Sequence, residues 1–271
     1  MTQSISDAAR AFRALHQNGL LILPNAWDAG SARIIEHAGA KAIATSSAAV
    51  AWAHGYPDGE ALPQETLLAC VREIVRVVGI PVSADIEAGF APDAAAAGAF
   101  TARVIDAGAV GINIEDGSEA PDLLAAKIER VKDASRKAGV DLWVNARTDV
   151  YLRQLAQGDA AYDQTVSRAR LYREAGADSI FVPGAVEETL VAKLVAGVVL
   201  PLNLLAWPGL PPAEKLKQLG VRRLSAGSGI AKVVLNNIDE MTQAFLADGR
   251  SEPFSAGALR NPEINKLMRR D

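Results

Sequence analysis

Eight short runs of β-forming residues recur along the chain with helical stretches between them, and this alternation restricts the fold more than any other feature. The runs are residues 20–28, 41–47, 80–89, 110–117, 141–149, 179–184, 200–207 and 222–229. Segments between them, such as 63–78 and 122–139, carry apolar residues at helical spacing. Apolar strands that alternate with helices form a parallel sheet covered on both faces. Eight such units predict an α/β fold, a (β/α)8 TIM-type barrel.

Length and charge narrow the classes of protein to consider. Residues 1–271 are predicted to form a single barrel domain, with an N-terminal helix at about 4–19 and a C-terminal helical tail at about 248–271. The net charge of −4 offers no basic surface for nucleic acid. No apolar stretch approaches the ~20 residues of a membrane span, and the N-terminus lacks the apolar core of a secretory signal. With a single cysteine and hence no intrachain disulfide, we expect a cytoplasmic protein without nucleic-acid or membrane partners.

Carboxylates follow two neighbouring predicted strands at the ends where TIM barrels place their active sites. Asp85 and Glu87 end the third run, and Glu115 ends the fourth. Residues two apart in a strand point to the same side, so these three side chains are expected to converge. Unpaired carboxylates repel one another, whereas Mg²⁺ takes oxygen ligands and keeps several waters. The pattern therefore predicts a magnesium site, for which Mn²⁺ is an alternative ion.

Further polar and aromatic residues at the same strand ends are candidates for contacting a substrate. They are Trp27, Ser46, Ser47, Arg147 and Asn203. The alternative is that each acid merely caps the next helix or pairs with a basic residue, an interpretation that suits Asp28 and Asp116 well. Three acids that converge with Arg147 favour a functional site, since charge clusters at a barrel mouth usually mark one.

Five motifs in this order resemble those of the isocitrate lyase and phosphoenolpyruvate mutase superfamily: NAWDAGSARIIEHAGAKAIATSS, GYPDG, PVSADIEAGF, GINIEDG and VNARTD. The motifs lie within residues 20–150, and the strand–helix rhythm extends the resemblance to about 247. The resemblance implies a Mg²⁺ ion and a 2-oxo acid or its enolate as ligand. It further implies that Asp85 binds the metal directly, while Asp58, Glu87 and Glu115 hold its water shell.

The resemblance also implies roles for the substrate-contacting residues and an assembly. Ser46 and Ser47 would offer backbone N–H groups and a hydroxyl to the substrate carboxylate, and Arg147 would bind that carboxylate or the enolate oxygen. Because the family often exchanges its eighth helix between subunits, a homodimer or homotetramer with a swapped eighth helix is expected.

The segment 117–127 departs from the family pattern. The lyases carry a Lys-Lys-Cys-Gly-His loop here, whose thiol protonates the leaving enolate, but this segment has neither Cys nor His. We therefore expect a Mg²⁺-dependent lyase that acts on a 2-oxo acid or related 2-hydroxy dicarboxylate through an enolate, by C–C cleavage or oxaloacetate-type decarboxylation. The alternatives are a methylisocitrate-type lyase with another acid, for which His54 or Tyr56 is the candidate, and a non-catalytic 2-oxo acid binding protein.

Other residues allow competing interpretations. The sequence SAGSG at 225–229 could form a barrel phosphate site of a sugar-phosphate aldolase or isomerase, or a tight turn into the last helix. No predicted strand end offers the lysine that a Schiff-base aldolase needs. Cys70 lies on an apolar helical stripe and is predicted to be a buried small hydrophobe. His16 and His37 fall on predicted helices and are expected at the surface.

Overall fold

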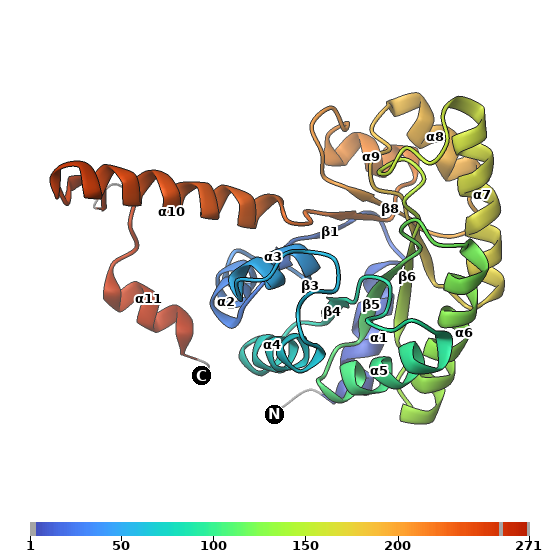
Figure 1. The fold of residues 1–271 in the computed structure, drawn as a ribbon, viewed down its shortest axis with the longest axis horizontal. Coiled ribbons are helices and arrows are strands. Elements are labelled where there is room, and N and C mark those ends of the chain that lie inside the picture. The colour runs from blue at the N-terminus through green and yellow to red at the C-terminus, as the bar shows by residue number, and fades with distance from the viewer. Residues whose placement is uncertain (1–3, 255–256, 270–271) are drawn as a thin grey trace.

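The protein folds into a parallel β-barrel surrounded by helices in a computed structural model that describes residues 4–254 and 257–269 (Figure 1). The strands of this described part are β1 (Leu21–Leu23), β2 (Asn25–Ala26), β3 (Ile43–Thr45), β4 (Val82–Asp85), β5 (Gly111–Glu115), β6 (Trp143–Arg147), β7 (Ser179–Phe181), β8 (Leu202–Leu205) and β9 (Arg223–Ser225). Each of the eight predicted runs contains a strand, so the predicted TIM-type barrel is confirmed. All pairings are parallel, in the order β1-β9-β8-β7-β6-β5-β4-β3-β2.

The first run forms two strands instead of one. Pro24 separates β1 from β2 and has no N–H to donate to a ladder. The backbone nevertheless continues the sheet on both sides, because the carbonyl of Leu23 accepts from Ala226 and that of Pro24 accepts from Ala44. β1 thus pairs with β9 and β2 with β3, and the broken strand closes the barrel.

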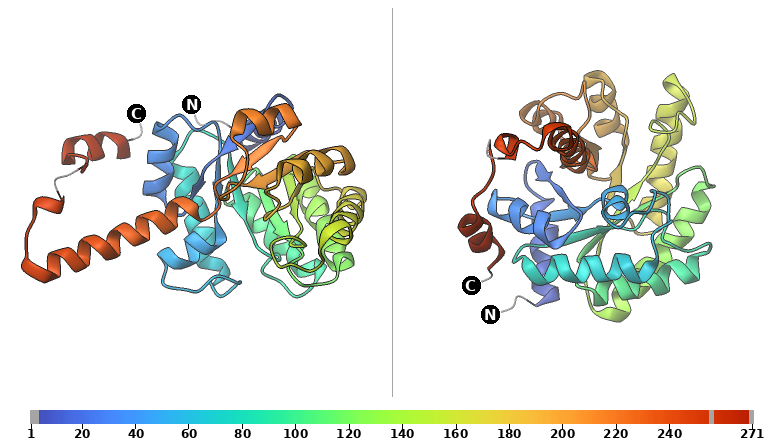
Figure 2. Two further views of the ribbon diagram at one scale, coloured as in Figure 1. Left: turned by 90° about the horizontal axis from the view of Figure 1, so that it is seen from above. Right: turned by 60° about the vertical axis from the view of Figure 1, so that its left-hand side comes forward.

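Helices alternate with the strands and cover the outside of the barrel (Figures 1 and 2). They are α1 (Ile5–Leu15), α2 (Ala29–His37), α3 (Ser47–Ala53), α4 (Gln64–Val77), α5 (Ala94–Asp106), α6 (Pro121–Ala138), α7 (Gly158–Glu174), α8 (Glu188–Gly197), α9 (Ala213–Leu219), α10 (Gly229–Asp248) and α11 (Asn261–Met268), with a short 3-10 helix at Glu252–Phe254. Local sequence sets several of their ends. Asp28 caps α2 in a capping box with Ser31, and Gly139 ends α6 in the left-handed conformation at φ 66°.

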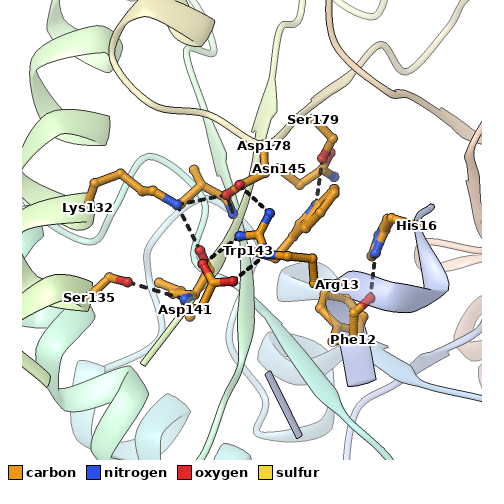
Figure 3. Close-up of polar contacts among 12 residues, drawn as sticks. Phe12, Arg13, His16, Lys132, Ser135, Asp141, Trp143, Asn145, Asp178 and Ser179 are labelled. Atoms are coloured by element: carbon orange, nitrogen blue, oxygen red, sulfur yellow. Dashed lines mark hydrogen bonds and ion pairs between the residues drawn. The ribbon is translucent and has the colours of Figure 1, made fainter. Parts of the chain in front are cut away.

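The N-terminal helix α1 closes the end of the barrel at which the strands begin. Phe12 is fully buried there and contacts Gly111, where any Cβ would lie 2.5 Å from its ring. His16 is also buried, stacks on Trp143 at a centroid distance of 4.0 Å, and places Nδ1 2.8 Å from the Phe12 carbonyl oxygen (Figure 3). The prediction that His16 lies at the surface was wrong, whereas His37 is exposed as predicted. Burial lowers the pKa of His16 to about 3, so its ring stays neutral.

The helix α10 projects away from the barrel and does not cover it (Figures 1 and 2). Of its residues only Ala231 is buried, and it exposes the apolar residues Ile230, Val233, Val234, Leu235, Ile238, Met241, Phe245 and Leu246. The outer wall beside β1 and β9 carries a hollow of about 700 Å³ whose lining includes Ile22, Ile35 and Leu224. This is the place where the alternation of strands and helices would put the eighth barrel helix. Within the residues that the structure covers, no helix is both long and apolar enough to cross a membrane.

Candidate functional site

A cavity of about 160 Å³ opens at the C-terminal end of the barrel, where the predicted site residues were expected. It is lined by Asn25, Ser46, Ser47, Ala48, Asp58, Asp85, Asn113, Arg147, Leu152, Phe181, Pro183, Leu205, Trp207, Ser225, Gly227 and Ser228. These residues come from the ends of strands all around the barrel and from the loops that follow them. The volume suits a small organic acid. The larger hollow beside β1 lies on the outer wall and has a mostly apolar lining.

Asp85, the last residue of β4, has a carboxylate that is only partly satisfied by the protein. Its Oδ2 accepts from the backbone N–H of Ser47 at 3.2 Å, and its own N–H donates to Thr45 Oγ1 at 2.8 Å. Its Oδ1 is buried and has no hydrogen-bond partner. Burial raises the pKa of Asp85, and the nearby Arg147 opposes that shift. A buried, unpartnered carboxylate oxygen is unfavourable, and a bound cation would satisfy it.

Glu87 lies beyond the end of β4, and its backbone adopts a left-handed conformation at φ 48°. The strand alternation used to predict its direction therefore does not apply. Its Oε2 accepts from the backbone N–H of Glu60 at 2.7 Å, while Glu60 Oε1 accepts from the N–H of Phe90 at 2.6 Å. These bonds tie the loop that carries Asp58 to the loop after β4. Burial raises the pKa of Glu87 to about 7, with Asp85 and Asp58 adding to the shift.

Arg147, at the end of β6, connects the acids on both sides of it. Its Nη1 lies 2.5 Å from Glu115 Oε2, and its Nε and Nη2 donate to the two oxygens of Asp149 at 2.6 and 2.9 Å. Burial nevertheless raises the pKa of Glu115 to about 8, because Arg147 is shared with Asp149 while Asp85 repels the Glu115 charge. The same two partners raise the pKa of Arg147 itself, which therefore remains a cation at the cavity.

The four predicted metal-site acids lie close enough to influence one another electrostatically. Asp58 and Asp85 raise the pKa of Glu87, and Asp85 and Glu87 raise that of Glu115. Among the described residues, however, no three acidic, histidine or cysteine side chains converge tightly enough to hold an ion by themselves. Mg²⁺ commonly takes only one or two carboxylates directly and keeps several waters. The donor set therefore fits a hydrated Mg²⁺ with a direct contact at Asp85.

Ser46 and Ser47 stand at the beginning of α3, on the rim of the cavity. Ser46 is the N-cap of this helix, and its Oγ accepts from the N–H of Ala49 at 3.4 Å. The N–H of Ser47 donates to Asp85 in the structure. Both serines line the cavity, but their polar groups also serve the local fold.

Three predicted substrate or catalytic residues are not among the residues that line the cavity. Trp27 packs against the core, whereas Trp207 is a lining residue. Asn203 is fully buried, and its amide lies 3.5 Å from Oγ of the lining residue Ser225. His54 is exposed at the end of α3.

The predicted residues that line the cavity are Asp58, Asp85, Ser46, Ser47 and Arg147. Glu87 and Glu115 do not line it, but they act electrostatically on the acids or on Arg147 beside it.

Three competing predictions can be compared with the structure. The predicted burial of Cys70 is confirmed; its Sγ lies 3.2 Å from the carbonyl oxygen of Trp27, and burial raises its pKa to about 12. Asp116 is fully buried and binds Arg168 and Tyr172, so it serves the fold as the alternative interpretation held. No lysine lines the cavity, which leaves the Schiff-base aldolase without its nucleophile.

Two functional features were missed by sequence reasoning. Leu152, Phe181, Pro183, Leu205 and Trp207 are the large apolar residues of the cavity lining, here called the apolar wall. Arg223, in β9, is 1% exposed inside the barrel below the cavity. The adjacent pair Arg222–Arg223 could have predicted a buried arginine, because neighbouring strand residues face opposite sides and one of the two had to point into the barrel.

The raised pKa values of the metal-site glutamates predict how the stability of the metal-free protein depends on pH. The folded state binds protons at Glu115 and Glu87 more tightly than the unfolded chain, whose glutamates titrate near 4.5. The stability from these protons is complete below that value and is lost as the pH rises through 7 and 8. In EDTA, Tm should therefore fall between about pH 6 and pH 9, measured by calorimetry.

Matched variants and added metal check this prediction. Glu115→Gln should flatten the fall in Tm, while Glu129→Gln, exposed on α6, should leave it unchanged. Saturating Mg²⁺ should remove the fall, because the metal binds the ionised site. A Tm in EDTA that rises over the same range would contradict the prediction.

Comparisons with known proteins agree with the fold. Residues 12–246 match the family described as phosphoenolpyruvate phosphomutase. A structure described as a lyase/mutase from Burkholderia cenocepacia J2315 is 33% identical, with a TM-score of 0.88 and coverage of 97% of this chain and 95% of that one. Phosphonopyruvate hydrolase, solved with oxalate and Mg²⁺, is 26% identical, with a TM-score of 0.84 and coverage of 96% and 94%. The 2-methylisocitrate lyase of Escherichia coli (strain K12) is 29% identical over 73% of this chain and 70% of that protein.

Proposed function

The chain belongs to the phosphoenolpyruvate mutase and isocitrate lyase superfamily, and from this membership we propose that it is a Mg²⁺-dependent lyase that decarboxylates a 2-oxo acid of the oxaloacetate type. Asp85 would bind the metal directly, and Asp58, Glu87 and Glu115 would hold its water shell. Mn²⁺ should replace Mg²⁺, since both ions take oxygen ligands. The relative solved with oxalate and Mg²⁺ supports this class of ligand.

The observation that carries the choice of reaction is that the cavity lining holds a single cation beside an apolar wall. Arg147 is the one cation among the lining residues, and it already pairs with Glu115 and Asp149. The apolar wall of Leu152, Phe181, Pro183, Leu205 and Trp207 adjoins it, with the Arg147 guanidinium 5.9 Å from the ring centroid of Phe181. Once the 2-oxo group engages the metal and Arg147, a carboxylate on C3 that lies against this wall would have no cation of its own. Its loss as neutral CO₂ relieves that unfavourable burial.

Arg147 would bind the substrate and stabilise its charge together with the metal, and neighbouring residues hold Arg147 in place. A bound Mg²⁺ would act as a Lewis acid toward the ketone oxygen. Arg147 has five N–H donors, of which Glu115 and Asp149 occupy three in the structure, so two remain for a substrate oxygen. Asp149 fixes the guanidinium with two bonds, and Arg153 at 2.9 Å fixes Asp149 in turn. Preorganised donors of this kind stabilise charge that develops on oxygen.

The absence of cysteine and histidine from the cavity lining agrees with decarboxylation. The residues between β5 and α6 include no cysteine or histidine, and neither His54 nor Cys70 lines the cavity. Loss of CO₂ leaves an enolate that water can protonate after the bond has broken. A methylisocitrate-type cleavage would instead need an acid for the departing dicarboxylate and a cation to bind it. A non-catalytic binding protein would retain the metal and Arg147 without turnover.

An assay with oxaloacetate tests the proposal directly. We expect CO₂ and pyruvate to form in proportion to enzyme, above the rate that Mg²⁺ alone produces, with loss of the enzymatic rate in EDTA and recovery with Mg²⁺ or Mn²⁺. Tight binding of 2-oxo acids without turnover would instead favour the binding protein.

We also propose that the active form is a homodimer in which α10 of each subunit covers the other's barrel, as the single unit or as half of a tetramer. The exposed apolar face of α10 and the hollow beside β1 and β9 are complementary in character, and α10 does not fill the hollow of its own barrel. A second copy offers both features in reciprocal positions, as a two-fold interface requires.

A charge on α10 should separate the subunits. Ile238 is 56% exposed in the single chain, and Ile238→Glu would bury an unpaired carboxylate in the proposed interface. We expect this variant to elute as a monomer at micromolar concentration in size-exclusion chromatography with light scattering. Asn237→Glu, an exposed polar position on the same helix, is the matched control and should not change the mass. A wild-type monomer would refute the assembly.

A further inference from the structure

A chain of hydrogen bonds runs through the barrel interior directly beneath the cavity. Trp143 Nε1 lies 2.8 Å from Ser179 Oγ, and Ser179 Oγ lies 2.6 Å from Asn145 Oδ1 (Figure 3). Asn145 Nδ2 lies 2.8 Å from Asn113 Oδ1, and Arg223 Nη2 reaches the same oxygen at 3.0 Å. All five side chains are at most 5% exposed. Arg223 reaches Asn113 from β9, on the side of the barrel opposite to β5.

The direction of donation along this series of hydrogen bonds follows from the groups at its two ends. The indole of Trp143 and the guanidinium of Arg223 can only donate hydrogen bonds. The Asn113 atom that faces Arg223 must therefore be the oxygen, whichever way the two amide atoms are assigned. From the other end, Ser179 accepts from Trp143 and has its own proton for Asn145, which leaves the Asn145 amide nitrogen to donate to Asn113. The Arg223 end fixes the orientation of the Asn113 amide, and the Trp143 end is compatible with it.

The amide nitrogen of Asn113 is consequently turned away from the interior chain. Asn113 lines the cavity, and its Nδ2 has no hydrogen-bond partner among the residues that the structure describes. In the sheet, Asn113 pairs with Asp85, the acid with the unpartnered buried oxygen. An N–H donor with a fixed direction thus stands beside the carboxylate that best fits a metal.

We propose that Asn113 binds the ligand by donating an Nδ2 hydrogen bond to an oxygen of the 2-oxo acid or its enolate, and that Asn145 and Arg223 are positioning residues that hold its amide in that orientation. The inference rests on the proposed function. An enolate oxygen carries more charge than a ketone oxygen, so this bond strengthens as the reaction proceeds. Asn113 needs a partner that can only donate, and this need accounts for an arginine at position 223. The arginine is kept there although its buried Nε and Nη1 have no hydrogen-bond partner.

Calorimetric titration with oxalate in the presence of Mg²⁺ tests the role of Asn113, because oxalate is a planar dianion like pyruvate enolate. Asn113→Ala should weaken oxalate binding about 10- to 100-fold, the range for one hydrogen bond to a charged group. Asn113→Asp should weaken it further, since it places a second acceptor beside the dianion while keeping a partner for Arg223 and hence the fold. Unchanged oxalate affinity in either variant would overturn the proposal.

Asn25→Ala is the matched control at the same cavity. Asn25 donates one of its two amide N–H groups to the Thr45 carbonyl and accepts from the Gly227 N–H, both at 2.8 Å, so both ends of its amide are already held by the fold. Its removal should weaken oxalate binding less than Asn113→Ala does. An equal or larger loss would show that general disturbance of the cavity explains the effect at Asn113.

Substitutions at Arg223 separate positioning from a purely structural role. Arg223→Met removes the donor and the unsatisfied nitrogens, so Tm should stay or rise while oxalate affinity falls. Arg223→Lys keeps a donor-only group and should retain more of the affinity than Arg223→Met. A lower Tm with unchanged oxalate affinity in Arg223→Met would overturn the positioning role. If oxaloacetate is not turned over but Asn113→Ala still weakens oxalate binding, the proposed function fails and the inference stands.

Discussion

Replacing Asp85 with alanine should abolish measurable Mg²⁺ binding and lower Mg²⁺-dependent turnover by about 10³-fold. The metal supplies several kcal/mol of charge stabilisation, and each ~1.4 kcal/mol is a factor of ten. In the structure Asp85 is the acid whose buried Oδ1 has no partner, so its removal deletes the one contact that a hydrated ion would make directly. Isothermal titration calorimetry with MgCl₂ measures the first effect, and the decarboxylation assay measures the second.

Other variants separate loss of the metal contact from loss of the fold. Asp85→Asn keeps an acceptor for the Ser47 N–H and should still lose Mg²⁺ affinity, because the charge is gone. Glu87→Gln and Glu115→Gln should weaken Mg²⁺ about 10- to 100-fold, as water-mediated contacts tolerate an amide. Asp93→Asn, at the N-cap of α5, is the control that should leave affinity unchanged. Wild-type Mg²⁺ affinity in Asp85→Ala would remove the metal-site assignment.

The barrel could be predicted because its determinants are local and repeated. Each strand is short, between two and five residues, but lies inside a longer apolar run that periodicity detects. The carboxyl ends of parallel strands meet at one mouth, so Asp85, Glu115 and Arg147 could be placed together without knowledge of their contacts. The break at Pro24 changes the count of strands and leaves the topology intact.

The missed features depend on contacts between segments far apart in sequence. Glu87 turns through a left-handed conformation that is held by Glu60, from a different loop. His16 was predicted at the surface because helix periodicity does not show that α1 closes the barrel from below. Arg223 acts across the barrel axis on Asn113, a contact that separates the partners by 110 residues. Such links can be read only after the strands have been arranged.

The residue types at the cavity give a physical reason to expect a reaction different from that of the lyases that the chain resembles. The acids predicted to hold the metal lie near Arg147, and the proposed function assigns to them and to Arg147 the stabilisation of an enolate. The segment that would carry the acid is different, and the apolar wall lies beside Arg147. Reactions that need only enolate stabilisation are thereby favoured over reactions that also protonate and bind a charged leaving group.

Decarboxylation of oxaloacetate should exceed cleavage of 2-methylisocitrate by about 10²–10⁴-fold in kcat, the usual contribution of a general acid such as the thiol that residues 117–127 lack. Both reactions require the metal and Arg147 to stabilise an enolate. The ratio of the two kcat values therefore reports the steps that differ, which are the protonation and binding of the leaving group. Parallel assays at saturating Mg²⁺, with EDTA blanks, measure it. Cleavage of 2-methylisocitrate at a rate comparable to the decarboxylation would contradict the ranking and point to an acid on another residue.

A cation in the apolar wall should reduce this preference by a predictable mechanism. Leu152 is half-buried in the wall. In Leu152→Lys the ammonium group would form an ion pair with the carboxylate on C3 of oxaloacetate, and this ion pair is lost when the carboxylate leaves as neutral CO₂. The ground state would gain more than the transition state, so kcat should fall about 3- to 10-fold while KM also falls. Leu152→Met, which keeps an apolar side chain of similar volume, should change neither constant by more than about twofold. If Leu152→Lys raises kcat, the apolar wall does not promote the loss of CO₂.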